Sequence, residues 1–145
     1  MKTVPNRWQY LLASLYACTA SAFFGAILLD ILYAHALSGN PDVSNSAAIL
    51  SQAADLLLLL GIVTFLAGFG AIGATWNLPS ARNLFIASLA VFAVEFLIPP
   101  LFGQFLRNLQ ANYGLAMGTW IRLLANAMSA TLAFAALFKL YRSGP

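Results

Sequence analysis

The chain has 145 residues, of which 61% are hydrophobic and only 8% are charged, and its mean hydropathy is +0.83. Water-soluble domains carry about 25% charged residues, so this composition excludes a soluble domain and indicates an integral membrane protein. The net charge of +3 is explained by basic residues that we expect at the inner membrane face. It does not indicate a basic patch for nucleic acid, so a nucleic-acid-binding role is excluded. With one cysteine and one histidine, the sequence predicts no disulfide, no metal site and no cofactor.

Four apolar stretches are long enough to cross a membrane, and they cover residues 9–37, 47–76, 84–106 and 115–141. About 20 helical residues span a hydrocarbon core of roughly 30 Å. The alternating pattern of a barrel strand is absent, and a lone span must satisfy its backbone hydrogen bonds internally. The sequence therefore predicts an all-α integral membrane protein. Its single domain, over residues 1–145, would be an antiparallel bundle of four transmembrane helices.

The first stretch begins after basic residues and resembles a signal peptide in its first half. We expect an uncleaved span instead, because the apolar run continues to Leu37. Asp30 lies inside this run, and Tyr33 follows it at helical spacing on the same face. A carboxylate is costly to hold inside a membrane, so we expect Asp30 to have either a partner or a function.

The second stretch carries one acid, Asp55, with Gln52 close to it. Its later half is rich in small residues, which let two helices approach closely. The glycines there are Gly61, Gly68, Gly70 and Gly73. We expect this surface to pack against the first helix, with a homodimer contact as the alternative.

The third stretch contains Glu95 followed by Pro99 and Pro100. A proline cannot donate a backbone hydrogen bond to the carbonyl group four residues earlier, and it bends a helix. We therefore predict a third helix kinked at Pro99-Pro100, with Glu95 at the break and the helix continuing to Leu106. The alternative is that the two prolines end a short helix at the membrane surface.

The fourth stretch has polar residues at helical spacing, in the order Thr119, Arg122, Asn126 and Ser129. A polar line of this kind would be unfavourable against lipid, so we expect it to face the bundle interior. Trp120 lies near the predicted outer surface and suits an interfacial aromatic belt. It is also a candidate ligand contact.

The basic residues predict the orientation of the bundle. They cluster before the first helix, between the second and third, and after the fourth, at Lys2, Arg7, Arg82, Lys139 and Arg142. Because cytoplasmic loops are enriched in lysine and arginine, we expect a multi-pass protein with both termini in the cytoplasm, most consistent with a bacterial inner membrane.

The ionisable residues lie at similar predicted depths. Asp30, Asp55 and Arg122 fall roughly 10 Å below the outer ends of their helices, and Glu95 falls somewhat deeper. We predict a polar pocket in the outer half of the bundle. The candidate catalytic residues are Glu95, Asp55, Asp30 and Arg122, and the candidate ligand-binding residues are Tyr33, Gln52, Asn126 and Trp120.

Three acids facing one arginine would leave unbalanced buried charge, which costs several kcal/mol per ion. We therefore expect Arg122 to pair with Asp55 or Asp30, and Glu95 to remain protonated. The favoured function is binding of a lipophilic small molecule, with acid–base chemistry of the isomerase, epoxide-opening or cyclase type. The alternatives are a non-catalytic accessory subunit of a larger membrane complex and a proton- or cation-coupled transporter.

Overall fold

The computed structural model describes residues 5–37, 43–101 and 115–143. Within these ranges the chain forms four helices: α1 (Arg7–Leu37), α2 (Val43–Ala74), α3 (Pro79–Leu101) and α5 (Leu115–Arg142). No strand occurs in the described ranges. The predicted all-α membrane bundle of four helices is confirmed.

Local signals explain where these helices begin and end. At the start of α1, the Asn6 side chain accepts from Arg7 N, and the Gln9 side chain accepts from Asn6 N, each at 2.8 Å. This reciprocal arrangement satisfies amides that have no partner inside the helix. The Gln9 amide also donates to Ala74 O at the end of α2, at 2.6 Å. α3 begins at Pro79, where the missing N–H removes no helical hydrogen bond.

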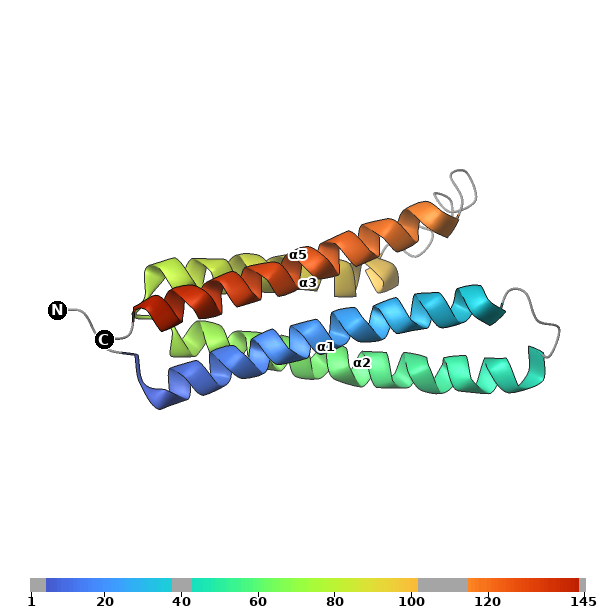
Figure 1. Ribbon diagram of the computed structural model, residues 1–145, viewed down its shortest axis with the longest axis horizontal. Coiled ribbons are helices and arrows are strands. Elements are labelled where there is room, and N and C mark those ends of the chain that lie inside the picture. Colours follow the sequence, from blue (N-terminus) through green and yellow to red (C-terminus); the bar gives the residue numbers. More distant parts are fainter. Residues whose placement is uncertain (1–4, 38–42, 102–114, 144–145) are drawn as a thin grey trace.

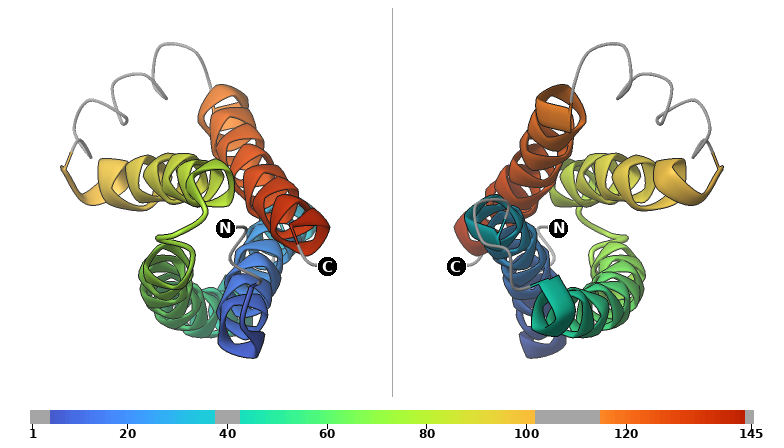
Figure 2. Two further views of the ribbon diagram at one scale, coloured as in Figure 1. Left: turned by 90° about the vertical axis from the view of Figure 1, so that its left-hand side faces the viewer. Right: turned by 90° about the vertical axis from the view of Figure 1, so that its right-hand side faces the viewer.

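The four helices form a ring in which α1 contacts α2 and α5, and α3 contacts α2 and α5. α1 therefore lies diagonally opposite α3, and α2 lies diagonally opposite α5. The start of α1, the end of α5 and the turn from α2 to α3 gather at one end, which we call the proximal end (Figure 1). Toward the other, distal end the helices diverge, and α3, α5 and α1 point apart (Figure 2).

Aromatic side chains fill the space between the diagonal helices α1 and α3. Tyr16 of α1 meets Phe85 of α3 edge-on, with ring centroids 5.9 Å apart, and Phe23 meets Phe92 at 5.0 Å. All four side chains are buried. Edge-to-face aromatic pairs add to the burial of their apolar area, so these contacts hold the centre of the bundle.

The glycines of α2 allow close packing against both α1 and α3, and Gly68 itself meets Leu89 of α3 and the Tyr16 ring of α1. A methyl group at Gly61 would collide with the Phe96 ring, and one at Gly68 would lie 2.6 Å from Leu89 Cδ1. Gly70 faces Leu12 of α1 at 3.5 Å. The expected contact with α1 is thus only part of the seam, because α2 lies between α1 and α3 in the ring and its glycines turn to both.

Three segments of the described chain are long and apolar enough to cross a membrane: Arg7–Leu29, Asp55–Ala74 and Ile121–Arg142. They overlap the first, second and fourth predicted spans. The third predicted span corresponds to α3, which is 23 residues long but begins with polar residues and is not among the three. Large apolar side chains cover the outward faces of the bundle, as lipid contact requires.

α3 remains helical through both Pro99 and Pro100 and ends at Leu101. Leu101 is also the last described residue before the gap at residues 102–114. The bend predicted at this point stays a prediction, and residues 102–106 of the predicted span lie outside the described residues.

Candidate functional site

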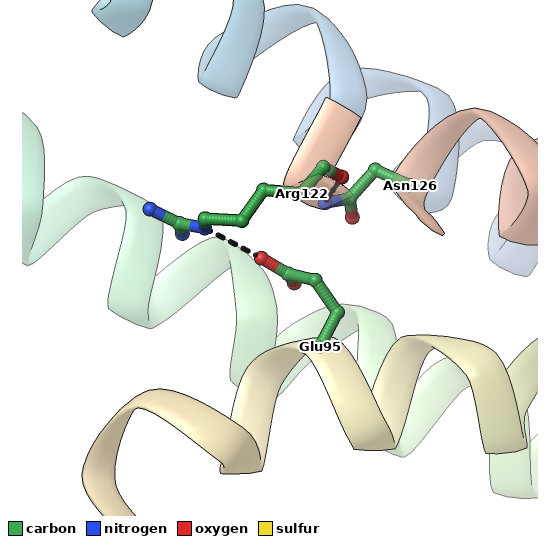
Figure 3. A network of polar contacts seen from close by, with 3 residues as sticks. All are labelled: Glu95, Arg122 and Asn126. Atoms are coloured by element: carbon green, nitrogen blue, oxygen red, sulfur yellow. Dashed lines mark hydrogen bonds and ion pairs between the residues drawn. The ribbon is translucent and has the colours of Figure 1, made fainter. Parts of the chain in front are cut away.

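An ion pair joins α3 to α5 in the distal half of the bundle. Arg122 Nε of α5 donates to Glu95 Oε1 of α3 at 2.9 Å (Figure 3). The two partners differ in exposure, since 3% of the Glu95 side chain is accessible and 49% of the Arg122 side chain is. The carboxylate is therefore inside the bundle, whereas about half of the Arg122 side chain is exposed at the surface.

Asn126 supports this pair from one turn further along α5. Its Nδ2 donates to the backbone carbonyl oxygen of Arg122 at 2.9 Å. Asn126 and Ser129 are both buried, as predicted for the polar line of this helix. Arg122 extends away from Asn126, toward the start of α5 and the distal end (Figure 3).

Glu95 has aromatic neighbours along α3. Phe92 lies one turn before it and Phe96 directly after it, and these two rings stack at 5.8 Å. Phe23 of α1 packs edge-on against both rings. Glu95 Oε2 is buried and has no hydrogen-bond partner in the part of the chain that the structure describes. Because burial without a partner is unfavourable for a polar atom, this oxygen is an acceptor that a bound donor would stabilise.

The pairing differs from the one predicted from sequence. Arg122 was expected to bind Asp55 or Asp30, with Glu95 protonated, but its partner in the structure is Glu95. The ring order explains the difference for Asp55, because α2 lies diagonally opposite α5 whereas α3 lies beside it. Asp55 is exposed on α2.

The structure thus brings together three of the predicted site residues, namely Glu95, Arg122 and Asn126. The side chains of four others lie outside the described residues: Asp30, Tyr33, Gln52 and Trp120. Their roles in a pocket stay predictions.

A second polar cluster, which the sequence interpretation did not identify as a unit, lies nearer the proximal end. Ser88 Oγ of α3 donates to Ser129 O of α5 at 2.6 Å, and Ser129 Oγ donates to Ser88 O at 3.0 Å. Tyr16 of α1 lies 2.8 Å from Ser88 Oγ. All three side chains are buried, so this cluster ties three helices together without any charge.

Residue spacing could have revealed both clusters. Ser88 and Glu95 are seven residues apart on α3, and Arg122 and Ser129 are seven residues apart on α5. α3 and α5 run antiparallel, so a register that places Ser88 opposite Ser129 also places Glu95 opposite Arg122. Seven residues are also close to two helical turns, so both pairs lie on one face.

Among the described residues, no group of His, Cys, Asp and Glu side chains could hold a metal ion. Comparison of the chain with protein-family models, with curated proteins and with solved structures finds no match. Function is therefore inferred from the side chains themselves.

Proposed function

We propose that this membrane protein binds the polar end of a lipophilic small molecule at the Glu95–Arg122 pair. The observation that carries the proposal is the half-exposed Arg122 side chain, whose guanidinium group contacts Glu95 through Nε alone among the described residues. The two Nη atoms have further N–H donors. Donors left without acceptors in a hydrocarbon environment are unfavourable, so a bound polar group would stabilise them.

The site would also suit acid–base chemistry. Glu95 is buried, and its Oε2 has no donor in the described part of the chain. A carboxylate in such a place can take up or release a proton during a reaction, while Arg122 stabilises the charged form. In this reaction Glu95 would be the acid–base group and Arg122 would orient the substrate, and a conformation that exposes Glu95 Oε2, which is buried here, would be required.

For the orientation, we propose that both termini are cytoplasmic and that the distal end faces outward, as in a bacterial inner-membrane protein. The described basic residues other than Arg122 belong to the proximal end: Arg7, Arg82, Lys139 and Arg142. The Arg82 guanidinium group lies 4.9 Å from the centre of the Trp76 ring, as an interfacial arginine and tryptophan would.

Purification from native membranes tests the proposed function. Wild-type protein and a double variant, Glu95→Gln with Arg122→Met, are extracted under the same conditions, and bound lipophilic molecules are identified by mass spectrometry. The double variant removes both charges, so neither is left unpaired. We expect a molecule in stoichiometric amount in the wild type and its loss in the variant. Equal recovery from both proteins would refute the proposal.

The pair itself favours a second candidate, a non-catalytic accessory subunit of a larger complex. One carboxylate meets one guanidinium group at 2.9 Å and joins two adjacent helices, which is enough for a purely structural contact. In that case, the same purification would recover a stoichiometric protein partner and no small molecule.

A further inference from the structure

We infer that the group bound at Arg122 is an uncharged carbonyl, as in a ketone, a quinone or an ester. This inference rests on the proposed function and specifies the chemical class of its ligand. The inference follows from the charge balance of the Glu95–Arg122 pair and from which atoms of the pair are accessible to a ligand.

The charge balance favours a neutral ligand. Arg122 and Glu95 contribute one positive and one negative charge, and they are in direct contact at 2.9 Å. An anionic ligand would therefore bring an uncompensated charge into an apolar environment, which is strongly unfavourable. A cationic ligand would need the carboxylate, but only 3% of the Glu95 side chain is accessible.

The reachable hydrogen-bonding groups favour an acceptor without a proton of its own. The exposed part of the pair belongs to Arg122, whose guanidinium group only donates. The free oxygen of the pair, Glu95 Oε2, is buried. An alcohol could accept from Arg122, but its own proton would find no acceptor there. A carbonyl oxygen has two lone pairs and no proton, so it matches the donors without leaving a group unpaired.

Two sources could supply this carbonyl: the ester groups of membrane phospholipids, or a separate lipophilic molecule. Both offer the same chemistry to Arg122. The experiment must therefore begin in a membrane whose lipids have no ester carbonyl.

The full-length protein is placed in nanodiscs of diether phosphatidylcholine. The probe is a long-chain methyl ketone with carbon-13 at its carbonyl, and infrared spectroscopy measures the stretching band of that carbonyl. Unlabelled alcohol and carboxylate of the same chain length serve as competitors. The proteins compared are the wild type, the double variant Glu95→Gln with Arg122→Met, and the control Lys139→Met, which removes an exposed basic residue from the opposite end of α5.

We expect a shifted ketone band in the wild type and in Lys139→Met, and none in the double variant. The alcohol and the carboxylate should each need a concentration at least about tenfold higher to displace the ketone, because an unpaired alcohol proton or an uncompensated carboxylate charge costs about a factor of ten in affinity or more. Ester phosphatidylcholine that displaces the ketone would identify the lipid as the source, and a ketone that stays bound would identify a separate molecule.

Two results would overturn the inference, and they are distinguishable. If the carboxylate or the alcohol displaces the ketone at equal or lower concentration, the ligand class is wrong, although a ligand site at Arg122 remains. If none of the three compounds binds differently to the wild type and the double variant, the proposed function fails with it.

Discussion

Replacement of Ser88 by alanine should destabilise the bundle more than replacement of either of its partners. The assignment of protons explains why. Each serine donates its only hydroxyl proton to the backbone carbonyl of the other, at 2.6 and 3.0 Å. The 2.8 Å contact between Tyr16 and Ser88 Oγ is then a hydrogen bond that Tyr16 donates.

The expected magnitude follows from this assignment. Ser88→Ala removes two interhelical hydrogen bonds, each contributing about 0.6 kcal/mol on average in a membrane. It also leaves the Tyr16 hydroxyl, which is 0% exposed, without its acceptor, at a further cost of about 1–3 kcal/mol. The total is about 2–4 kcal/mol. Tyr16→Phe and Ser129→Ala each remove one donated hydrogen bond and leave no buried donor unpaired, so we expect about 0.6–1.7 kcal/mol for either.

Reversible unfolding in mixed detergent micelles, followed by circular dichroism, measures these differences in the free energy of unfolding. The three single variants are compared with the wild type in one detergent series. The proton assignment is refuted if Tyr16→Phe or Ser129→Ala destabilises the protein as much as Ser88→Ala does.

Three further predictions concern other parts of the bundle. Arg122→Met should destabilise the protein by about 1–3 kcal/mol in the same unfolding assay, because it leaves a buried carboxylate unpaired. Adding Glu95→Gln should recover most of that loss of stability. A double variant no more stable than the single variant would contradict this prediction. Gly68→Ala should lower the free energy of unfolding by about 1–3 kcal/mol, because its methyl group would crowd a side chain of α3. Gly73→Ala meets open space and should be neutral or slightly stabilising. Equal effects of the two substitutions would show that the glycine-rich surface of α2 is not tightly packed. A cysteine introduced by Ser143→Cys, with the native cysteine removed, should resist a membrane-impermeant thiol reagent in intact cells and react after lysis; labelling of intact cells would place the carboxyl terminus outside.

The sequence was sufficient for the helical class because hydrophobicity decides which segments enter a membrane. The spans predicted for the first, second and fourth helices each overlap one of the three apolar segments found in the structure. Boundaries were less accurate, since α3 begins at Pro79, before the apolar run that starts at Leu84. A proline at the first position of a helix is a start signal that hydrophobicity alone does not register.

Partner choice within the site could not be obtained from depth alone. Asp55 and Arg122 were placed at the same predicted height, yet they belong to helices that lie diagonally across the ring. Height along a helix follows from residue number, but adjacency depends on the order of helices around the bundle. Two arrangements with equal hydropathy can differ in that order. Glu95 is the partner because α3 lies beside α5.

The two polar clusters on α3 and α5 have different consequences for the same helix pair. The serine contacts lie seven residues from the ion pair on each helix, or roughly 10 Å along the axis. A slip of α3 by one residue would rotate its polar face by about 100° and separate both pairs together. The uncharged cluster, which is fully buried, therefore fixes the register in which Glu95 meets Arg122. In the proposed function, Arg122 would then bind its ligand through its other donors while Nε keeps the contact with Glu95.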